Sequence, residues 1–244
     1  MRKFNFNEGE VLLIDKPYKW TSFDVISKVR AHIRSQLGLK KLKVGHAGTL
    51  DPLATGIVIV CTGKLTKRIN EFQDEIKEYT GTFHVGATTP SFDLEKEIDF
   101  TFDTSHLTEA LIYEAAIALT GDFDQMPPIF SAKKVNGKRA YEFARQNIAV
   151  ELKTRKVTIS EFEITRINLP EVDFRVVCSK GTYIRSLARD FGEKLNCGAH
   201  LTALRRTQNG NLRIEDALSM ETVLDEITQY AGSQKDFLPI DDTI

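Results

Sequence analysis

Cysteine is scarce in this sequence, and the scarcity excludes a small protein held together by disulfide bonds. Only Cys61, Cys178 and Cys197 occur among the 244 residues, and an odd, widely spaced set does not build a disulfide framework. Buried free thiols in a reducing compartment are therefore the expectation. Cys197 and His200 have a spacing that zinc ligands use, but no second pair of ligands accompanies them, which argues against a metal site.

Long apolar runs and a secretory leader are also missing. Runs such as residues 57–61 are far too short to cross a bilayer, and residues 1–8 have no apolar core. We therefore expect a cytoplasmic protein with no membrane partner. Because no linker rich in Gly, Ser or Pro divides the chain, the sequence predicts one catalytic domain at residues 1–213. An acidic segment at residues 214–244 should complete or flank it.

A net charge of −1 hides an uneven distribution of charged residues. Residues 127–213 carry 17 Lys and Arg against 8 Asp and Glu, whereas residues 91–126 carry 1 against 9 and residues 214–244 carry 1 against 8. A basic region beside two acidic ones fits a protein with one RNA-facing surface. Uneven solvated charge with no partner is the alternative.

Hydrophobic periodicity predicts an α+β fold with a mixed β-sheet. A helix capped by Thr21 or Ser22 should run to Leu37 and stop at Gly38. Residues 39–56 resemble a loop. The other elements expected are strands at residues 10–14, 57–61, 79–85, 156–164 and 174–178, and helices at residues 107–119 and 182–195.

The segment at residues 45–56, Gly-His-Ala-Gly-Thr-Leu-Asp-Pro-Leu-Ala-Thr-Gly, is the first that indicates chemistry. Its three glycines allow the backbone to approach a ligand closely. Pro52 disfavours helical geometry at Asp51, so this carboxylate is well placed to be a preorganised reactive group. A simple turn built on the aspartate side chain is the alternative.

A second segment, residues 179–187, turns at Gly181 from a strand into a helix and places Tyr183 and Arg185 in the first helical turn. Arginine is unfavourable there because the helix dipole is positive at its N-terminus. Arg185 therefore fits a specific anionic partner, either a carboxylate or a phosphate. An ordinary exposed arginine is the alternative.

A third segment, residues 125–145, mixes prolines, basic residues and aromatic residues. Extended basic chain with Tyr and Phe is how RNA-binding proteins hold phosphates and stack bases. A loop and helix whose aromatic side chains pack inward is the alternative.

Together these segments resemble the bacterial tRNA pseudouridine-55 synthases, the TruB family, which isomerise a uridine in the T loop of tRNA. The resemblance runs from about residue 10 to residue 223. It also includes Leu-Ile-Asp-Lys-Pro at residues 13–17, Lys-Glu-Tyr at residues 77–79 and Gly-Ala-His-Leu-Thr-Ala-Leu-Arg-Arg at residues 198–206. It implies the pseudouridine synthase fold, with a mixed central β-sheet flanked by helices and RNA-binding loops. It also implies a tRNA-modifying isomerase that flips its target base.

The resemblance implies three catalytic residues. Asp51 matches the family's nucleophile, Tyr79 matches the tyrosine that packs on the target base, and Arg185 matches the arginine that pairs with the aspartate. A guanidinium beside a carboxylate lowers its pKa by about 1–3 units and so keeps it ionised. The fork of donors adds a direction that lysine would not.

Further residues are expected to bind the substrate. Tyr183 and Leu204 match residues that line the uracil pocket, His46 matches the histidine that enters the T loop, and Lys16 matches a residue near the active site. Base flipping costs a few kcal/mol, and packing on the base offsets part of it. The basic residues expected to hold the RNA backbone are Lys64, Lys133, Lys138, Arg205 and Arg206.

Two departures from the family pattern have consequences. Members often carry Thr-Asp-Thr and a glycine around the acidic turn that follows the tyrosine strand, whereas this chain has Thr-Pro-Ser-Phe-Asp at residues 89–93 and keeps Asp93. Many members also end in an RNA-binding domain of the PUA type. Because Arg213 is followed only by a segment of about thirty residues, acidic overall, we expect a short form without a PUA domain and with weaker RNA binding.

The implied reaction breaks the N1–C1′ bond, turns the uracil and rejoins it through C5. A carboxylate suits this chemistry because it can attack an electron-poor carbon and later leave. The residues leave open whether Asp51 attacks the base or the sugar, and whether Asp51, Tyr79 or a water removes H5. No step needs an outside electron or group, so we predict no metal and no organic cofactor. We expect a monomer that acts on tRNA without a guide RNA.

Three other functions compete with this reading. A non-catalytic RNA-binding or RNA-folding protein on the same scaffold is disfavoured by the intact Asp51, Tyr79 and Arg185. A guide-dependent synthase is disfavoured by the missing terminal extensions and PUA domain. A glycosidase-like enzyme usually needs a paired acid, and no second carboxylate is evident near Asp51.

Overall fold

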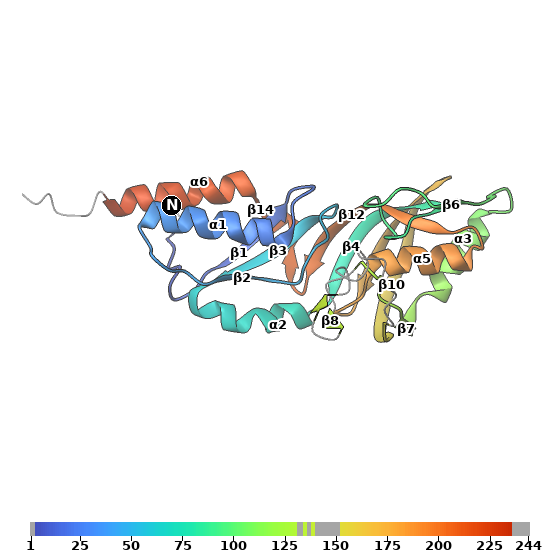
Figure 1. The fold of residues 1–244 in the computed structure, drawn as a ribbon, viewed down its shortest axis with the longest axis horizontal. Coiled ribbons are helices and arrows are strands. Elements are labelled where there is room, and N and C mark those ends of the chain that lie inside the picture. The colour runs from blue at the N-terminus through green and yellow to red at the C-terminus, as the bar shows by residue number, and fades with distance from the viewer. Residues whose placement is uncertain (1–2, 131–133, 136–137, 140–151, 236–244) are drawn as a thin grey trace, which may run out of the picture. The chain divides into compact units, whose positions relative to one another are not determined.

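The computed structural model describes residues 3–130, 134–135, 138–139 and 152–235. The chain divides into two compact units, of which unit 1 comprises Met1–Glu75 and Arg206–Ile244 and unit 2 comprises Ile76–Arg205. Both units combine β-strands with helices (Figure 1), which confirms the predicted α+β class. The domain boundary predicted at residue 213 stays a prediction.

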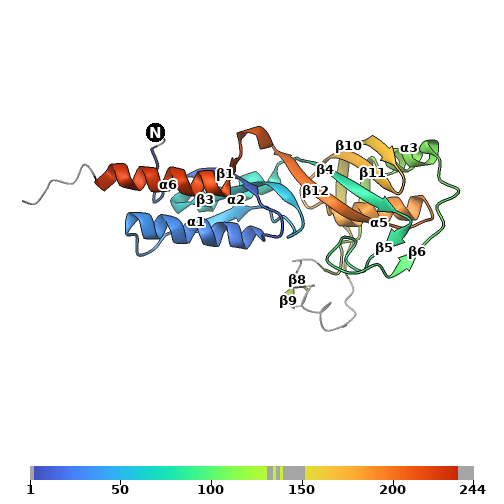
Figure 2. The same ribbon diagram turned by 90° about the horizontal axis from the view of Figure 1, so that it is seen from above.

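Unit 1 is built on a mixed sheet. Its strands are β1 (Val11–Lys16), β2 (Val44–Ala47), β3 (Thr55–Thr62), β13 (Leu212–Arg213) and β14 (Leu218–Ser219). β1 pairs antiparallel with β3 and parallel with β14, and β2 pairs antiparallel with β3. Helices α1 (Ser22–Leu37) and α6 (Met220–Lys235) lie side by side on one face (Figures 1 and 2). The other face carries η1 (Gly63–Arg68) and α2 (Ile69–Asp74), which pack on the buried cluster of Ala47, Ile57, Ile59 and Cys61.

Local signals in the sequence account for α1. Thr21 caps it through a capping box with Asp24, and Gly38 ends it in the left-handed conformation at φ 65°. The apolar positions Val25, Ile26, Val29 and Ile33, which follow helical spacing, are buried. The predicted bounds of this helix are confirmed.

The loop predicted at residues 39–56 is wrong in part, because β2 lies within it. Its sequence Val-Gly-His-Ala has one β-branched residue and no alternating pattern. The strand forms because its backbone pairs with β3, with His46 opposite Val60 and Ala47 opposite Ile59. A strand that forms through pairing with its neighbour need not carry a periodic pattern of its own.

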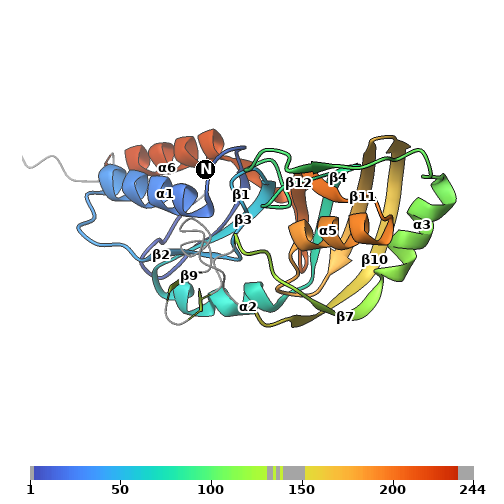
Figure 3. The same cartoon turned by 45° about the vertical axis from the view of Figure 1, so that its right-hand side comes forward.

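Unit 2 contains a sheet with the strand order β12-β4-β11-β10-β7, in which β4, β11, β10 and β7 pair antiparallel. Four phenylalanines form its aromatic core, in which Phe83 stacks on Phe174 at 4.1 Å between ring centroids and Phe162 and Phe191 adjoin them. Figure 3 shows α5 lying across the sheet and α3 lying at the end of the sheet near β10. The elements of unit 2 are β4 (Lys77–Val85), β5 (Ala87–Thr88), β6 (Phe100–Thr101), α3 (Glu109–Ala118), β7 (Gly121–Gln125), β8 (Lys134–Val135), β9 (Lys138–Arg139), β10 (Arg155–Asn168), β11 (Glu171–Cys178), α5 (Ile184–Lys194) and β12 (Ala199–Asn209), whose last four residues belong to unit 1.

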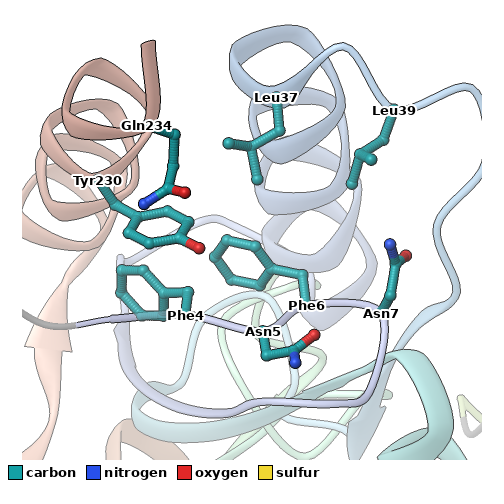
Figure 4. A pocket seen from close by; sticks show the side chains of 8 residues that line it. All are labelled: Phe4, Asn5, Phe6, Asn7, Leu37, Leu39, Tyr230 and Gln234. Carbon is teal, nitrogen blue, oxygen red and sulfur yellow. The ribbon is translucent and has the colours of Figure 1, made fainter. Parts of the chain in front are cut away.

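The N-terminal segment packs against α6 in unit 1. Phe4 stacks on Phe6 at 4.8 Å between ring centroids, and Tyr230 meets Phe4 edge-on. Figure 4 shows these three rings, with amide and leucine side chains, lining a groove between the N-terminal segment, α1 and α6. None of the predicted site residues lines this groove.

Two glycines of unit 1 allow a test of how tightly β3 packs. Gly38 and Gly56 both have positive φ, at 65° and 100°, but only Gly56 is crowded, because an added Cβ would lie 2.3 Å from the carbonyl oxygen of Arg206. Gly38→Ala should cost about 1–2 kcal/mol for the left-handed conformation alone. Gly56→Ala should cost about 1–3 kcal/mol more, through overpacking. Urea unfolding of the two variants measures the difference, and equal losses would contradict this packing.

Candidate active site

The loop at residues 48–54 holds Asp51 in unit 1. The Leu50 N–H donates to Ser22 Oγ at 2.9 Å, the Lys19 N–H donates to the Pro52 carbonyl at 2.9 Å, and the Ala54 N–H donates to the Asp51 carbonyl at 3.1 Å. The Asp51 side chain is half-buried. The loop is therefore fixed on both sides of the aspartate, as a preorganised reactive group requires.

Lys16 lies beneath this loop and is 1% exposed. Its Nζ donates to the carbonyls of Pro17 at 3.0 Å, Trp20 at 2.5 Å and Pro52 at 3.2 Å. Burial lowers the pKa of Lys16 to about 8, and the negative charge of Asp51 is the largest influence in the opposite direction. Lys16 thus supplies a buried cation within electrostatic reach of Asp51. Its role in the active site stays a prediction.

The lowered pKa of Lys16 leads to a pH prediction. Turnover should fall as pH rises through about 8, because deprotonation removes the cation that faces Asp51. The Lys16 contribution to the free energy of unfolding should instead rise between about pH 8 and 10.5, because the unfolded chain then binds the proton more tightly. Turnover rates and urea unfolding, both measured across this pH range, test the predicted fall in turnover and the predicted rise in stability. An alkaline loss of turnover that persists unchanged in Lys16→Met would contradict the assignment.

The burial of Arg206 contradicts the role predicted for it. We expected it to hold the RNA backbone, but it is 1% exposed, and its guanidinium donates to the carbonyls of Ile57, from Nε at 2.8 Å, and Gly48, from Nη2 at 3.1 Å. A side chain enclosed in this way is not available to phosphates. Arg206 instead joins the two ends of the loop that carries Asp51.

His46 lies on β2 and is half-buried. Burial, and then the positive charge of Arg206, lower the pKa of His46. The imidazole is therefore neutral near pH 7, and a neutral ring can enter an RNA loop without first losing a proton.

Arg185 is the second residue of α5 in unit 2 and is 4% exposed. Its Nε lies 3.6 Å from Asp93 Oδ2, Nη1 donates to the Ser91 carbonyl at 3.4 Å, and Nη2 donates to the Phe130 carbonyl at 3.0 Å. An arginine near a helix N-terminus was expected to have an anionic partner, and within unit 2 Asp93 is one. We gave Asp93 no role from the sequence, although its retention in a changed motif was a signal.

The turn at residues 89–93 has a defined geometry despite its departure from the family pattern. Phe92 adopts a positive φ of 62°, and the Arg189 guanidinium lies 5.2 Å from the centre of its ring. The hydroxyls of Thr89 and Ser91 both donate to the Asp93 carbonyl, at 2.7 and 3.1 Å. These contacts keep the Asp93 carboxylate beside Arg185.

The predicted base-contacting residues of unit 2 come from three elements. Tyr79 lies on β4 and Leu204 on the adjacent β12, and their exposed fractions are 8% and 9%. Tyr183 precedes α5, and its main chain forms two hydrogen bonds with the side chain of Gln125, at 2.8 and 3.1 Å. Gln125 is 2% exposed and fixes the start of α5. No sequence pattern distinguishes this glutamine from a surface one.

The other residues predicted to bind the RNA backbone differ in what the structure describes. Lys64 is exposed and forms an ion pair with Glu8 at 2.7 Å, and Arg205 is half-buried. Lys133 and the side chain of Lys138 lie outside the described residues.

The net positive charge of residues 127–213 is also partly neutralised. Arg166 forms an ion pair with Asp173 and Arg175 forms ion pairs with Glu78 and Glu161. An excess of cations in a segment therefore does not equal a basic surface.

The described residues contain no group of His, Cys, Asp and Glu that could hold a metal ion. All three cysteines are buried free thiols, as expected. Among the described residues, no helix is long and apolar enough to cross a membrane.

Comparison with known proteins agrees with these observations. The model of the TruB family pseudouridylate synthase N-terminal domain matches residues 34–184, and that of the tRNA pseudouridylate synthase B C-terminal domain matches residues 185–244. The chain belongs to the TruB family of pseudouridylate synthases. The predicted family, fold and enzyme class are thereby confirmed, whereas the roles of individual residues stay predictions.

Two relatives are similar over most of their length. The tRNA pseudouridine synthase B of Phocaeicola vulgatus is 62% identical over 218 residues, which cover 89% of this chain and 93% of that protein. That of Flavobacterium johnsoniae is 59% identical and covers 91% and 97%.

Two solved structures are also similar to the TruB-family chain. They are an archaeal box H/ACA sRNP Nop10–Cbf5 complex (TM-score 0.66, 25% identity) and a Cbf5–Nop10–Gar1 complex (TM-score 0.68, 27% identity). The matches cover 94% and 93% of this chain, but only 57% and 60% of the chains they match.

Proposed function

We propose that this chain converts uridine 55 in the T loop of tRNA to pseudouridine, with Asp51 as the nucleophile. The observation that carries the proposal is the placement of Asp51 on a loop joined by hydrogen bonds to two buried cations, Lys16 and Arg206. Relatives named tRNA pseudouridine synthase B, at up to 62% identity, support tRNA as the substrate.

The reaction needs only groups that the chain supplies. The Asp51 carboxylate attacks an electron-poor carbon of the nucleotide, the N1–C1′ bond breaks, and the freed uracil turns. The C5–C1′ bond then forms, H5 leaves as a proton, N1 takes up a proton, and Asp51 is released. Atoms and charge balance without an outside reactant, as an isomerisation requires.

In this proposal Arg185 pairs with Asp51, as the family resemblance implies, and holds its carboxylate in place. Hydrogen bonds to the Ser91 and Phe130 carbonyls and the nearby Asp93 carboxylate already fix the guanidinium within unit 2. A fixed donor loses little conformational entropy when its carboxylate partner arrives. The pairing therefore orients the nucleophile.

The target uracil must leave the RNA stack before it can react. Flipping a loop nucleotide costs a few kcal/mol, and we propose that Tyr79 and Leu204 offset this cost by packing on the base, which contributes about 1–3 kcal/mol. Both side chains are largely buried, so only a small, water-poor part of each is left to meet the base. Tyr183 lines the same pocket, and neutral His46 takes the place that the base vacates.

The RNA backbone requires separate contacts. We propose that Lys64, Lys133, Lys138 and Arg205 bind phosphates, so that affinity falls as salt rises. Arg206 is not among them, because it is buried.

A guide-dependent synthase is the second candidate, and the similarity to Cbf5 complexes favours it. An activity assay that contains only the purified chain and unmodified tRNA distinguishes the two functions. Carbodiimide treatment marks pseudouridine, and primer extension then maps its position. We expect a single stop that corresponds to position 55. A reaction that needs an added RNA would favour the guide-dependent function, and a single stop at another position would overturn the proposed target.

A further inference from the structure

Three exposed lysines follow α1 in unit 1. Lys40, Lys41 and Lys43, which we term the basic loop, lie between Gly38 and β2. Within the described part of the chain none of the three forms an ion pair, although many other basic residues do. Their charges are therefore available to an outside anion.

The basic loop is attached firmly at both ends. The Leu39 N–H donates to the Arg34 carbonyl at 3.0 Å, and Arg34 Nε donates to the Leu39 carbonyl at 3.3 Å, which ties its start to the end of α1. At its other end the Gly63 N–H donates to the Lys43 carbonyl at 2.9 Å. A charged segment anchored in this way presents its cations at a defined place.

The register of β2 relates the basic loop to the proposed site. Lys43 precedes His46 by three residues, which is about 10 Å along a strand. Lys43 also adjoins the start of η1, where Lys64 and Lys67 are exposed. An RNA that His46 enters would therefore have its backbone within reach of the basic loop.

We propose that Lys40, Lys41 and Lys43 bind phosphates of the double-helical stem that carries the target loop. This inference rests on the proposed function. Lysine is a compact charge on a long stem and suits phosphate contact without base recognition. Residues 38–45, Gly-Leu-Lys-Lys-Leu-Lys-Val-Gly, contain no aromatic residue on which an unpaired base could stack. The chemistry therefore fits duplex backbone better than single-stranded RNA.

The test compares two triple variants of the full chain. One combines Lys40→Gln, Lys41→Gln and Lys43→Gln. The control combines Lys28→Gln, Lys156→Gln and Lys194→Gln, which removes equal charge from exposed lysines that have no ion pair among the described residues. Affinity for unmodified tRNA and for an isolated T stem-loop is measured at about 50–200 mM salt. Single-turnover rates are measured at saturating RNA.

The basic-loop variant should reduce the slope of log affinity against log salt by about 2–3, since each lost phosphate contact contributes about 0.7–0.9. The change should be the same for tRNA and for the stem-loop, and the saturated rate should stay unchanged. An unchanged slope, an equal change in the control, or a change seen with tRNA alone would each overturn the inference. Failure of the proposed function would instead show as no isomerisation by the unsubstituted chain, whatever the slopes.

Discussion

Asp51→Asn should abolish isomerisation while tRNA binding survives. The amide matches the carboxylate in size but is neither charged nor nucleophilic, so the covalent step has no attacking group. Loss of a nucleophile typically lowers turnover by about 10⁴-fold or more. The loop itself should stay in place, because its anchors are the main chain of Leu50, Pro52 and Ala54.

Single-turnover assays and filter binding measure the two effects of Asp51→Asn separately. Asp225→Asn, on the exposed side of α6, is the matched control and should behave as the unsubstituted chain does. Turnover that survives in Asp51→Asn would remove the nucleophile from the mechanism. Turnover and binding lost together would indicate a role for Asp51 in holding the RNA.

Arg185→Lys should reduce single-turnover isomerisation by about 100-fold with little change in RNA affinity. A guanidinium interacts at once with Asp93, Ser91 and Phe130, and one ammonium cannot reproduce that geometry. Misplacement of a catalytic group by about 1 Å is enough for a loss of this size. Asp93→Asn should lower the rate in the same direction, because Asp93 positions Arg185.

Arg189→Lys is the control for Arg185→Lys. Arg189 lies one turn further along α5, pairs with Asp190 and is half-buried. A lysine at this position keeps a cation close to the Phe92 ring, so the turn that holds Asp93 should be preserved and the control tests α5 itself. Urea unfolding of each variant shows whether the fold is kept. A rate for Arg185→Lys no lower than that for Arg189→Lys would contradict the proposed pairing with Asp51.

The features predicted correctly are those with local causes. Helix α1 carries its cap at Thr21, its apolar stripe and its stop at Gly38 within one stretch of chain, so its bounds followed from pattern. The Asp51 loop also stood out through local residues, because Pro52 restricts the chain beside one carboxylate and Gly48 and Gly56 permit the positive φ angles on either side. The catalytic role of Asp51 stays a prediction. The family resemblance then gave the roles that pattern alone left open.

The features that were missed depend on contacts between distant segments. The sequence does not distinguish Arg206 from its neighbour Arg205, so both were predicted to bind RNA. In the structure the Arg206 guanidinium donates to the Ile57 and Gly48 carbonyls. Gln125 and Asp93 likewise have functions defined by α5, which lies some 60 and 90 residues away along the chain. Hydrogen bonds of this kind leave no periodic trace in a single sequence.

Tritium release tests the central claim most directly. The substrate is an unmodified tRNA transcript that carries 5-tritiated uridine, and the control transcript has cytidine in place of uridine 55. We predict release of one tritium per tRNA and none from the control, because only a uridine that rejoins through C5 loses its H5. Release that persists from the control, or no release despite tight binding, would contradict the account.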